Sequence, residues 1–150
     1  MTTIRTRGLD HWGYTVSDAE RTARFYEEAF GARRVWDIEL AGDGVAEATQ
    51  VPGADLRAIL LSFGNAAIEL FEYRGTGGAT QIARADALGA GHLGLEVEDL
   101  DAAYARLQEL GVPCRLPPQH VEEGPLAGLS WFYFTDPDGL LVELTHHRAA

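Results

Sequence analysis

The chain has little cysteine, little positive charge and no long run of apolar residues. It has 150 residues and one cysteine, Cys114, so neither an intramolecular disulfide nor a cysteine metal cluster can form. No stretch approaches the roughly 18 apolar residues that a membrane span needs. The opening residues, MTTIRTRGLDHW, lack the apolar core of a signal peptide. We therefore expect a cytoplasmic protein with no membrane partner.

Basic residues are scarce relative to acidic ones. The chain carries 12 Lys and Arg against 23 Asp and Glu, which gives a formal net charge of −11. Such a charge repels phosphate backbones and anionic membrane surfaces, so we expect a small-molecule partner rather than nucleic acid. The length, with 46% hydrophobic residues, is that of one compact domain.

The sequence contains an internal repeat. The stretch LDHWGYTVSDAERTARFYEEAFGARRV begins at Leu9, and AGHLGLEVEDLDAAYARLQELGVPCRL begins at Ala90. When His11 is aligned with His92, both copies run from a strand-like segment through a helical one to a glycine, and the second copy is one residue shorter. A repeat of this kind is typical of a duplicated supersecondary unit.

Each copy has the signals of a strand followed by a helix. Ser17 and Glu20 form an S-x-x-E capping box, which predicts a helix start, and Gly31 predicts its end. Asp99 and Gly111 are the corresponding signals in the second copy. The apolar faces predicted for the two helices comprise Phe25, Tyr26, Ala29 and Phe30 in the first and Leu100, Ala103, Tyr104 and Leu107 in the second.

Three strand candidates follow each predicted helix. They are residues 33–40, 56–63 and 66–73 in the first half and 112–117, 129–136 and 140–147 in the second. Turn signals at Gly64-Asn65 and at Pro137-Asp138-Gly139 separate the last two strands of each half. The sequence thus predicts an α+β fold of two tandem βαβββ modules. We expect a long loop over 42–55 and a Gly- and Ala-rich linker between the modules.

Charged residues interrupt the last predicted strand of each half. Glu69 stands between Ile68 and Leu70, and Glu143 stands between Val142 and Leu144. Strand side chains alternate between faces, so each glutamate points away from its apolar neighbours. A glutamate in this position is unusual unless its face of the sheet holds something polar or charged.

A histidine opens each half. His11 shares a strand face with Gly13, and His92 shares one with Gly94, so that there is room beside each imidazole. A single histidine or glutamate in a strand is more often a core or surface residue than a ligand. Because the pattern recurs at equivalent positions of a repeat, it favours a divalent metal site with nitrogen and oxygen ligands.

The chain resembles the vicinal oxygen chelate superfamily from about Leu9 to Thr145. The segments that carry the resemblance are the two copies of the repeat, AAIELFEY and WFYFTDPDGLLVEL. The superfamily includes glyoxalase I, methylmalonyl-CoA epimerase, extradiol dioxygenases and bleomycin-resistance proteins. The resemblance implies one domain over 1–150, with modules at about 8–74 and 91–147, a linker at about 75–90 and an open barrel-like mixed sheet around the metal. The ligands that it implies are His11, Glu69, His92 and Glu143.

The complete ligand set is most similar to the glyoxalase I and epimerase branches. A fourth carboxylate at Glu69 argues against the extradiol dioxygenases, which need open metal positions. Gly13 and Tyr14 stand where a glutathione-binding basic residue would help a glyoxalase I, and no clear coenzyme A signature is present. A small-molecule binding or resistance protein and a metal-dependent dioxygenase therefore remain alternatives to a lyase or isomerase.

The resemblance also implies a mechanism and an assembly. A divalent ion (Zn, Ni, Co, Mn or Fe) would polarise a substrate carbonyl, and a carboxylate would move the proton next to it. Glu143 is the first choice for that base, with Glu69 as its possible partner. Many relatives are homodimers, so a homodimer is expected, with modules paired within one chain or between two. Neither the substrate nor the metal follows from the sequence.

Other candidates carry weaker signals. His146 and His147 stand at the end of the last predicted strand, His120 stands in a predicted loop, and Glu96 shares a strand face with His92. The arginines that could bind an anionic group are Arg5, Arg7, Arg57 and Arg74. The aromatic residues expected in the core or at an interface are Trp12, Trp36, Trp131, Phe132 and Tyr133.

Overall fold

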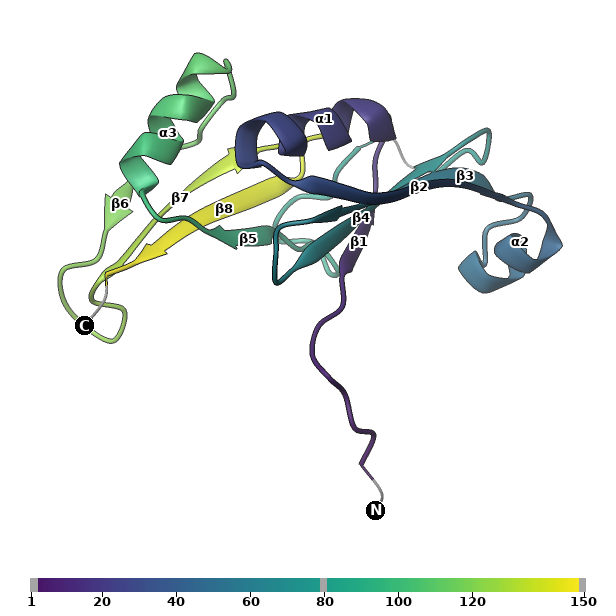
Figure 1. The fold of residues 1–150 in the computed structure, drawn as a ribbon, viewed down its shortest axis with the longest axis horizontal. Coiled ribbons are helices and arrows are strands. Elements are labelled where there is room, and N and C mark those ends of the chain that lie inside the picture. Colours follow the sequence, from purple (N-terminus) through teal and green to yellow (C-terminus); the bar gives the residue numbers. More distant parts are fainter. Residues whose placement is uncertain (1–2, 79–80, 149–150) are drawn as a thin grey trace. The chain divides into compact units, whose positions relative to one another are not determined.

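The chain passes twice through a strand, a helix and then three strands, and the first pass has an additional short helix between the first two of these three strands (Figure 1). A computed structural model describes residues 3–78 and 81–148. The contacts divide the chain into two compact units, within residues 1–78 and within residues 79–150. No helix in the described ranges is long and apolar enough to cross a membrane.

The first unit contains a four-stranded mixed sheet. Its elements are β1 (Trp12–Thr15), α1 (Ala19–Phe30), β2 (Arg33–Ala41), α2 (Asp43–Thr49), β3 (Asp55–Ser62) and β4 (Ala67–Tyr73). The strand order is β1-β4-β3-β2, in which β1 runs parallel to β4 and the other neighbours are antiparallel. Helix α1 packs on β2, β3 and β4.

The second unit repeats this topology. Its elements are β5 (Leu93–Glu96), α3 (Leu100–Glu109), β6 (Gln119–His120), β7 (Leu129–Thr135) and β8 (Leu141–His147). The strand order is β5-β8-β7-β6, with β5 parallel to β8 and the other pairs antiparallel. The predicted α+β class and the two βαβββ modules are confirmed.

The ends of the helices are set by local hydrogen bonds. The backbone N–H of Arg21 donates to the Asp18 side chain at 2.9 Å, so Asp18 caps α1 and the predicted cap at Ser17 is wrong. Asp99 caps α3 as predicted, because its carboxylate accepts from the N–H of Ala102. Gly31 ends α1 with φ of 64°, a left-handed conformation that glycine adopts without steric cost.

Helices α1 and α3 each bury one stripe. In α1 the fully buried residues include Ala23 and Tyr26, whereas Phe25 and Phe30 are only half-buried, so the packed face is rotated from the predicted one. In α3 the predicted face is confirmed, with Leu100 and Leu107 buried. The largest buried side chains of the sheets are Leu56, Ile59, Leu61, Ile68, Leu70, Phe132, Phe134, Val142 and Leu144.

Two expectations about the connections are wrong. The predicted loop over 42–55 contains α2, whose sequence DGVAEAT includes the good helix formers Ala and Glu. The predicted strand over 112–117 is reduced to one bridge, from Cys114 to Phe134, followed by the two-residue β6. Pro113, Pro117 and Pro118 lack the N–H groups that a longer ladder requires.

Candidate functional site

The first half brings His11 and Glu69 together. His11 immediately precedes β1, and Glu69 lies in β4, where Gly13 is its partner in the parallel register. The histidine Nε2 lies 2.9 Å from the glutamate Oε2. Only 14% of the Glu69 side chain is exposed, compared with 39% of His11, so the carboxylate is the more enclosed member of the pair.

The second half brings His92 and Glu143 together in the same way. His92 immediately precedes β5, and Gly94 lies opposite Glu143 in the parallel pairing of β5 with β8. The Nε2–Oε2 distance is 3.0 Å. Each predicted histidine therefore meets the predicted glutamate of its own half. Within the described part of either unit, no group of three or more His, Cys, Asp and Glu side chains forms a metal-binding cluster.

The two pairs differ in their neighbours. The Asp10 carboxylate lies 2.7 Å from Nδ1 of His11 and accepts its hydrogen bond, which leaves Nε2 as the nitrogen that faces Glu69. Sequence reasoning missed Asp10, although its position next to His11 was a usable signal. His92 instead packs edge-on against the ring of Tyr133, with the ring centroids 5.7 Å apart.

Tyr133 is also the cross-strand neighbour of the second glutamate. It lies directly opposite Glu143 across the β7–β8 ladder. Burial, together with the negative charge of Glu143, raises the pKa of the Tyr133 hydroxyl above its ordinary value. Sequence reasoning grouped Tyr133 with the core and interface aromatics. The pairing across the Pro137-Asp138-Gly139 turn was the signal that would have placed it beside Glu143.

The surroundings of each glutamate follow from strand alternation. In the first unit, the cross-strand neighbours on the face of Glu69 are apolar, with Leu60 opposite it and Trp36 opposite Leu60. In the second unit, Trp131 shares this strand face with Tyr133. Its ring packs edge-on against the Tyr133 ring, with the ring centroids 5.3 Å apart. Both glutamates thus project from the sheet face opposite to their buried strand neighbours.

Comparison with known proteins identifies the family. A model of the Glyoxalase/Bleomycin resistance protein/Dioxygenase superfamily matches residues 8–144. The chain belongs to this superfamily. The predicted resemblance to the vicinal oxygen chelate proteins is therefore confirmed.

The relatives of this superfamily member include a named enzyme. A 2-epi-5-epi-valiolone epimerase from an Actinomyces species is 35% identical over 142 residues, which cover 91% of this chain and 77% of that protein. The uncharacterised protein YaeR of Escherichia coli is 38% identical over 61 residues, covering 41% of this chain and 44% of YaeR.

Solved structures show the same fold. A glyoxalase family protein from Bacillus cereus superposes with a TM-score of 0.82 at 18% identity and 99% coverage of both chains. Glyoxalase I of Leishmania major gives a TM-score of 0.66 at 21% identity, covering 94% of this chain and 87% of that one. At these identities the likeness establishes the glyoxalase fold and no more.

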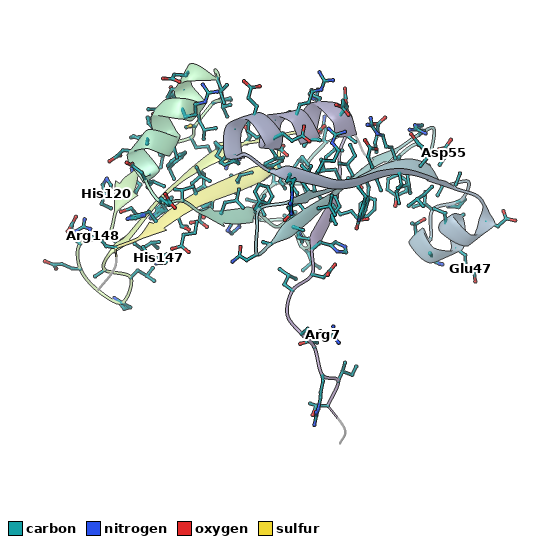
Figure 2. The ribbon with its side chains drawn as sticks, viewed as in Figure 1. Arg7, Glu47, Asp55, His120, His147 and Arg148 are labelled. Atoms are coloured by element: carbon teal, nitrogen blue, oxygen red, sulfur yellow. The ribbon has the colours of Figure 1, made fainter. Side chains whose placement is uncertain are left out.

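The remaining histidines of this superfamily member lie apart from the His92–Glu143 pair. Nδ1 of His120 lies 2.8 Å from the buried Ser130 hydroxyl, and Nδ1 of His146 lies 3.0 Å from the Val97 carbonyl. By strand alternation, His146 points to the face opposite Glu143. Figure 2 shows His120 and His147 near the ends of their strands. None of them joins the predicted ligand set.

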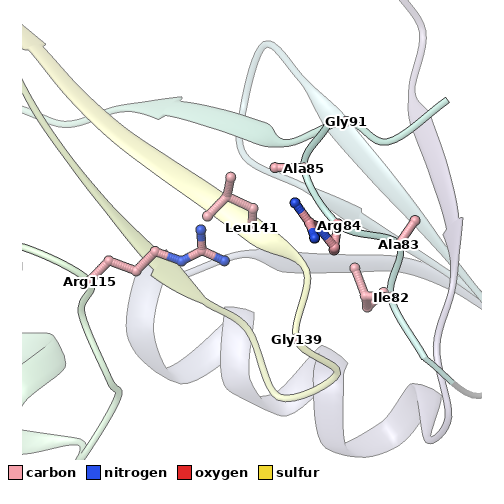
Figure 3. Close-up of a pocket in the computed structure, with 8 residues that line it drawn as sticks. All are labelled: Ile82, Ala83, Arg84, Ala85, Gly91, Arg115, Gly139 and Leu141. Atoms are coloured by element: carbon pink, nitrogen blue, oxygen red, sulfur yellow. The ribbon is translucent and has the colours of Figure 1, made fainter. Parts of the chain in front are cut away.

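A small recess lies at the start of β8 in the second unit (Figure 3). Its volume is about 200 Å³, below the several hundred typical of ligand pockets. Arg84 and Arg115 project into it, and Arg84 is also paired with Asp86 at 2.9 Å. Leu141, which lines the recess, shares a strand face with Glu143.

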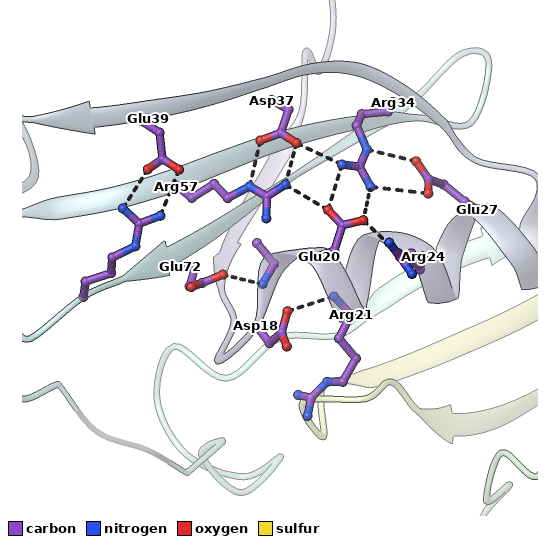
Figure 4. Close-up of polar contacts among 12 residues, drawn as sticks. Asp18, Glu20, Arg21, Arg24, Glu27, Arg34, Asp37, Glu39, Arg57 and Glu72 are labelled. Atoms are coloured by element: carbon purple, nitrogen blue, oxygen red, sulfur yellow. Dashed lines mark hydrogen bonds and ion pairs between the residues drawn. The ribbon is translucent and has the colours of Figure 1, made fainter.

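Two of the arginines considered for anion binding are engaged in ion pairs instead. Arg57 donates to both Glu20 and Asp37, and Arg34 bridges the same two carboxylates (Figure 4). Arg74 is paired with Glu39 and Asp55. Hydrogen bonds from Arg34, Arg24 and Arg57 lower the pKa of Glu20 to about 2. This network ties α1 to β2 and β3 and has no direct contact with Glu69.

Proposed function

We propose that this chain is a metal-dependent isomerase or lyase of the glyoxalase and epimerase type. In this proposal it transfers a proton at the carbon next to a carbonyl of a small substrate. The observation that carries the proposal is the recurrence of one His–Glu pair, at one register position beside a glycine, in both halves of the chain. His11, Glu69, His92 and Glu143 are the proposed ligands.

The donor atoms fit a divalent transition metal. Two imidazole nitrogens and two carboxylate oxygens suit Zn, Ni, Co, Mn or Fe. In each half, Nε2 of the histidine and Oε2 of the glutamate face one another at 2.9 and 3.0 Å, so both donor atoms of a pair would be available to one ion. Asp10 supports the fit, because a carboxylate on Nδ1 is the usual outer partner of a metal-binding histidine.

The acid–base work falls to the two carboxylates. When bound, the metal supplies Lewis-acid polarisation of the substrate carbonyl. Glu143 removes the proton from the neighbouring carbon, and Glu69 holds the proton that is returned from the other side. Inversion of a carbon centre needs an acid and a base on opposite faces, and the repeat supplies one carboxylate from each half.

The named relative favours inversion over the other chemistries of the superfamily. A match at 35% identity that covers 91% of this chain and 77% of an epimerase supports an isomerase acting on a small ketone, and makes 2-epi-5-epi-valiolone the first substrate to test. We also propose a homodimer, which light scattering after size exclusion tests directly. The cytoplasmic location expected from the sequence stays a prediction.

The test combines metal analysis with proton exchange. Protein purified without chelator is expected to contain about one divalent ion per four-ligand site. In D₂O it is expected to wash deuterium into 2-epi-5-epi-valiolone at a carbon next to the carbonyl, observed by NMR. Glu143→Gln and Glu69→Gln are each expected to abolish turnover. Glu96→Gln is the matched control, because Glu96 is exposed on the strand face of His92 and outside the pair.

Each outcome separates the candidate functions. Absence of bound metal, with no activity after metal is added, would exclude the enzyme and leave a binding or resistance protein. A requirement for both O₂ and Fe(II) would indicate a dioxygenase. Full turnover by Glu143→Gln would exclude Glu143 as the base.

A further inference from the structure

The small recess at the start of β8 adjoins the second His–Glu pair (Figure 3). Gly91, which lines the recess, immediately precedes His92 in the chain. Leu141, which also lines it, lies two residues before Glu143 on the same strand face. Two residues along a strand span about 7 Å. A group held in the recess would therefore lie within reach of a small molecule that also contacts Glu143.

The segment before β5 forms one wall of the recess by packing on the turn before β8. A β-carbon built on Gly139 would stand 3.7 Å from Cγ1 of Ile82, so the Ile82 side chain lies over this glycine. Ala83, Arg84 and Ala85 continue the same wall. The volume of about 200 Å³ is too small for a whole substrate. It is several times the roughly 30 Å³ that a water molecule occupies in the liquid, which is enough for a carboxylate or phosphate group.

Two guanidinium groups supply positive charge to the recess. Figure 3 shows Arg84 and Arg115 projecting into it from two sides. Arg84 is held in place by Asp86, because its Nε and Nη2 donate to the two carboxylate oxygens at 3.0 and 2.9 Å. These bonds use two of the five N–H donors that a guanidinium carries, so the others remain available to a ligand.

Arg115 brings a charge that no carboxylate in the described part of the chain balances. Its backbone N–H donates to the Tyr133 carbonyl at 2.8 Å, which anchors the residue beside β7. Asp86 offsets one of the two positive charges and leaves the other. The chain as a whole has a formal net charge of −11, so a locally positive recess favours a specific anionic ligand over a general affinity for anions.

We propose that the recess binds an oxyanionic group, a carboxylate or a phosphate, that the substrate carries. Guanidinium groups bind both anions through paired, charge-assisted hydrogen bonds. This inference rests on the proposed function for the reaction, and it narrows the substrate to a small carbonyl compound with an anionic group about 7 Å from Glu143. With the anion held in the recess, the carbonyl end is directed toward the second His–Glu pair.

The first test measures the binding of inorganic phosphate, which needs no substrate. Phosphate is titrated into ¹⁵N-labelled protein at constant ionic strength, and the backbone amide signals of Gly91 and Gly139 report on the recess. Both signals are expected to shift and to saturate. Acetate, titrated in the same way, represents the carboxylate, and the anion with the lower dissociation constant identifies the preferred group. Absence of a saturating shift with both anions overturns the inference.

A matched pair of variants shows whether the recess or the overall charge binds the anion. Arg115→Gln is expected to weaken phosphate binding by about 5- to 10-fold. Arg148→Gln is the control, because Arg148 is an exposed arginine of the same unit that pairs with Glu122 at 3.5 Å, outside the recess. It is expected to bind phosphate like the parent. Equal losses in the two variants would assign the effect to overall charge and overturn the inference. The remaining amide signals show whether each variant is folded.

Glu143→Gln separates this inference from the proposed function. It disables the proposed metal site, yet it is expected to bind phosphate at least as well as the parent, because it removes a negative charge near the recess. If this variant loses phosphate binding, the anion lies on the metal and the inference is overturned. If the parent contains no metal but binds phosphate as expected, the proposed function fails and the anion site stands.

Discussion

Gly13 lies directly opposite Glu69 in the parallel register of β1 with β4. A β-carbon built on Gly13 would stand 2.8 Å from Cε2 of Phe71, which shares the strand face of Glu69. The equivalent Gly94, opposite Glu143, has nothing within 4 Å of such a β-carbon. The space beside the first pair is therefore tighter than the space beside the second.

This difference predicts unequal tolerance of alanine. Gly13→Ala forces the Phe71 ring to move and is expected to be about 1–3 kcal/mol less stable than Gly94→Ala. Gly94→Ala is expected to equal or slightly exceed the stability of the parent, because alanine loses less backbone freedom on folding. Urea denaturation measures both variants. Equal stabilities would show that Phe71 moves aside without cost.

The observed cap of α1 predicts the effect of a second pair of substitutions. Asp18→Ala removes the acceptor for the Arg21 N–H and is expected to reduce the free energy of unfolding by about 1 kcal/mol. Ser17→Ala removes the cap that the sequence pattern indicated and is expected to change it by less than about 0.5 kcal/mol. Thermal unfolding followed by circular dichroism compares the two. A larger loss from Ser17→Ala would contradict the assignment of Asp18.

The Glu20 network predicts a dependence of stability on pH. The folded-state pKa of Glu20 is about 2, below its ordinary value of 4.5, mainly through the hydrogen bond from Arg34. The unfolded chain therefore binds more protons between these values, and the stabilisation is lost as pH falls from about 5 to about 2. Allowing for solvent screening, Glu20→Gln is expected to cost about 1 kcal/mol at pH 7 and almost nothing near pH 2.

Stability curves at several pH values test this dependence. Glu47→Gln is the matched control, because Glu47 is an exposed glutamate on α2, outside the network. Its stability is expected to follow that of the parent over the whole range. A Glu20→Gln deficit that persisted unchanged at pH 2 would have to come from packing rather than from charge.

The turn before β8 depends on a buried carboxylate. Asp136 is only 5% exposed, and its Oδ1 accepts from the N–H groups of Asp138 and Leu140 at 3.0 and 2.8 Å. Asp136→Ala leaves these donors without that acceptor and is expected to cost about 1–3 kcal/mol. Asp136→Asn keeps an acceptor oxygen and is expected to cost less. Urea denaturation of both variants checks the order, and a reversal would show that the charge matters more than the hydrogen bonds.

The sequence by itself determined the parts of this protein that depend on local periodicity. The repeat from His11 and His92, the cap at Asp99, the stop at Gly31 and the placement of each glutamate on the face opposite its apolar neighbours all follow from spacings of a few residues. Because both halves obey the same local rules, the sequence also placed one histidine at the first strand and one glutamate in the last strand of each module.

Tertiary structure alone decided which residues lie beside the two pairs. Tyr133 faces Glu143 because the length of a turn fixes the register of β7 with β8, whereas Leu60 takes the same place in the first half. The arginine network required α1 to lie against β2 and β3. These outcomes depend on pairing and packing between segments distant in sequence, whose energies no local pattern records.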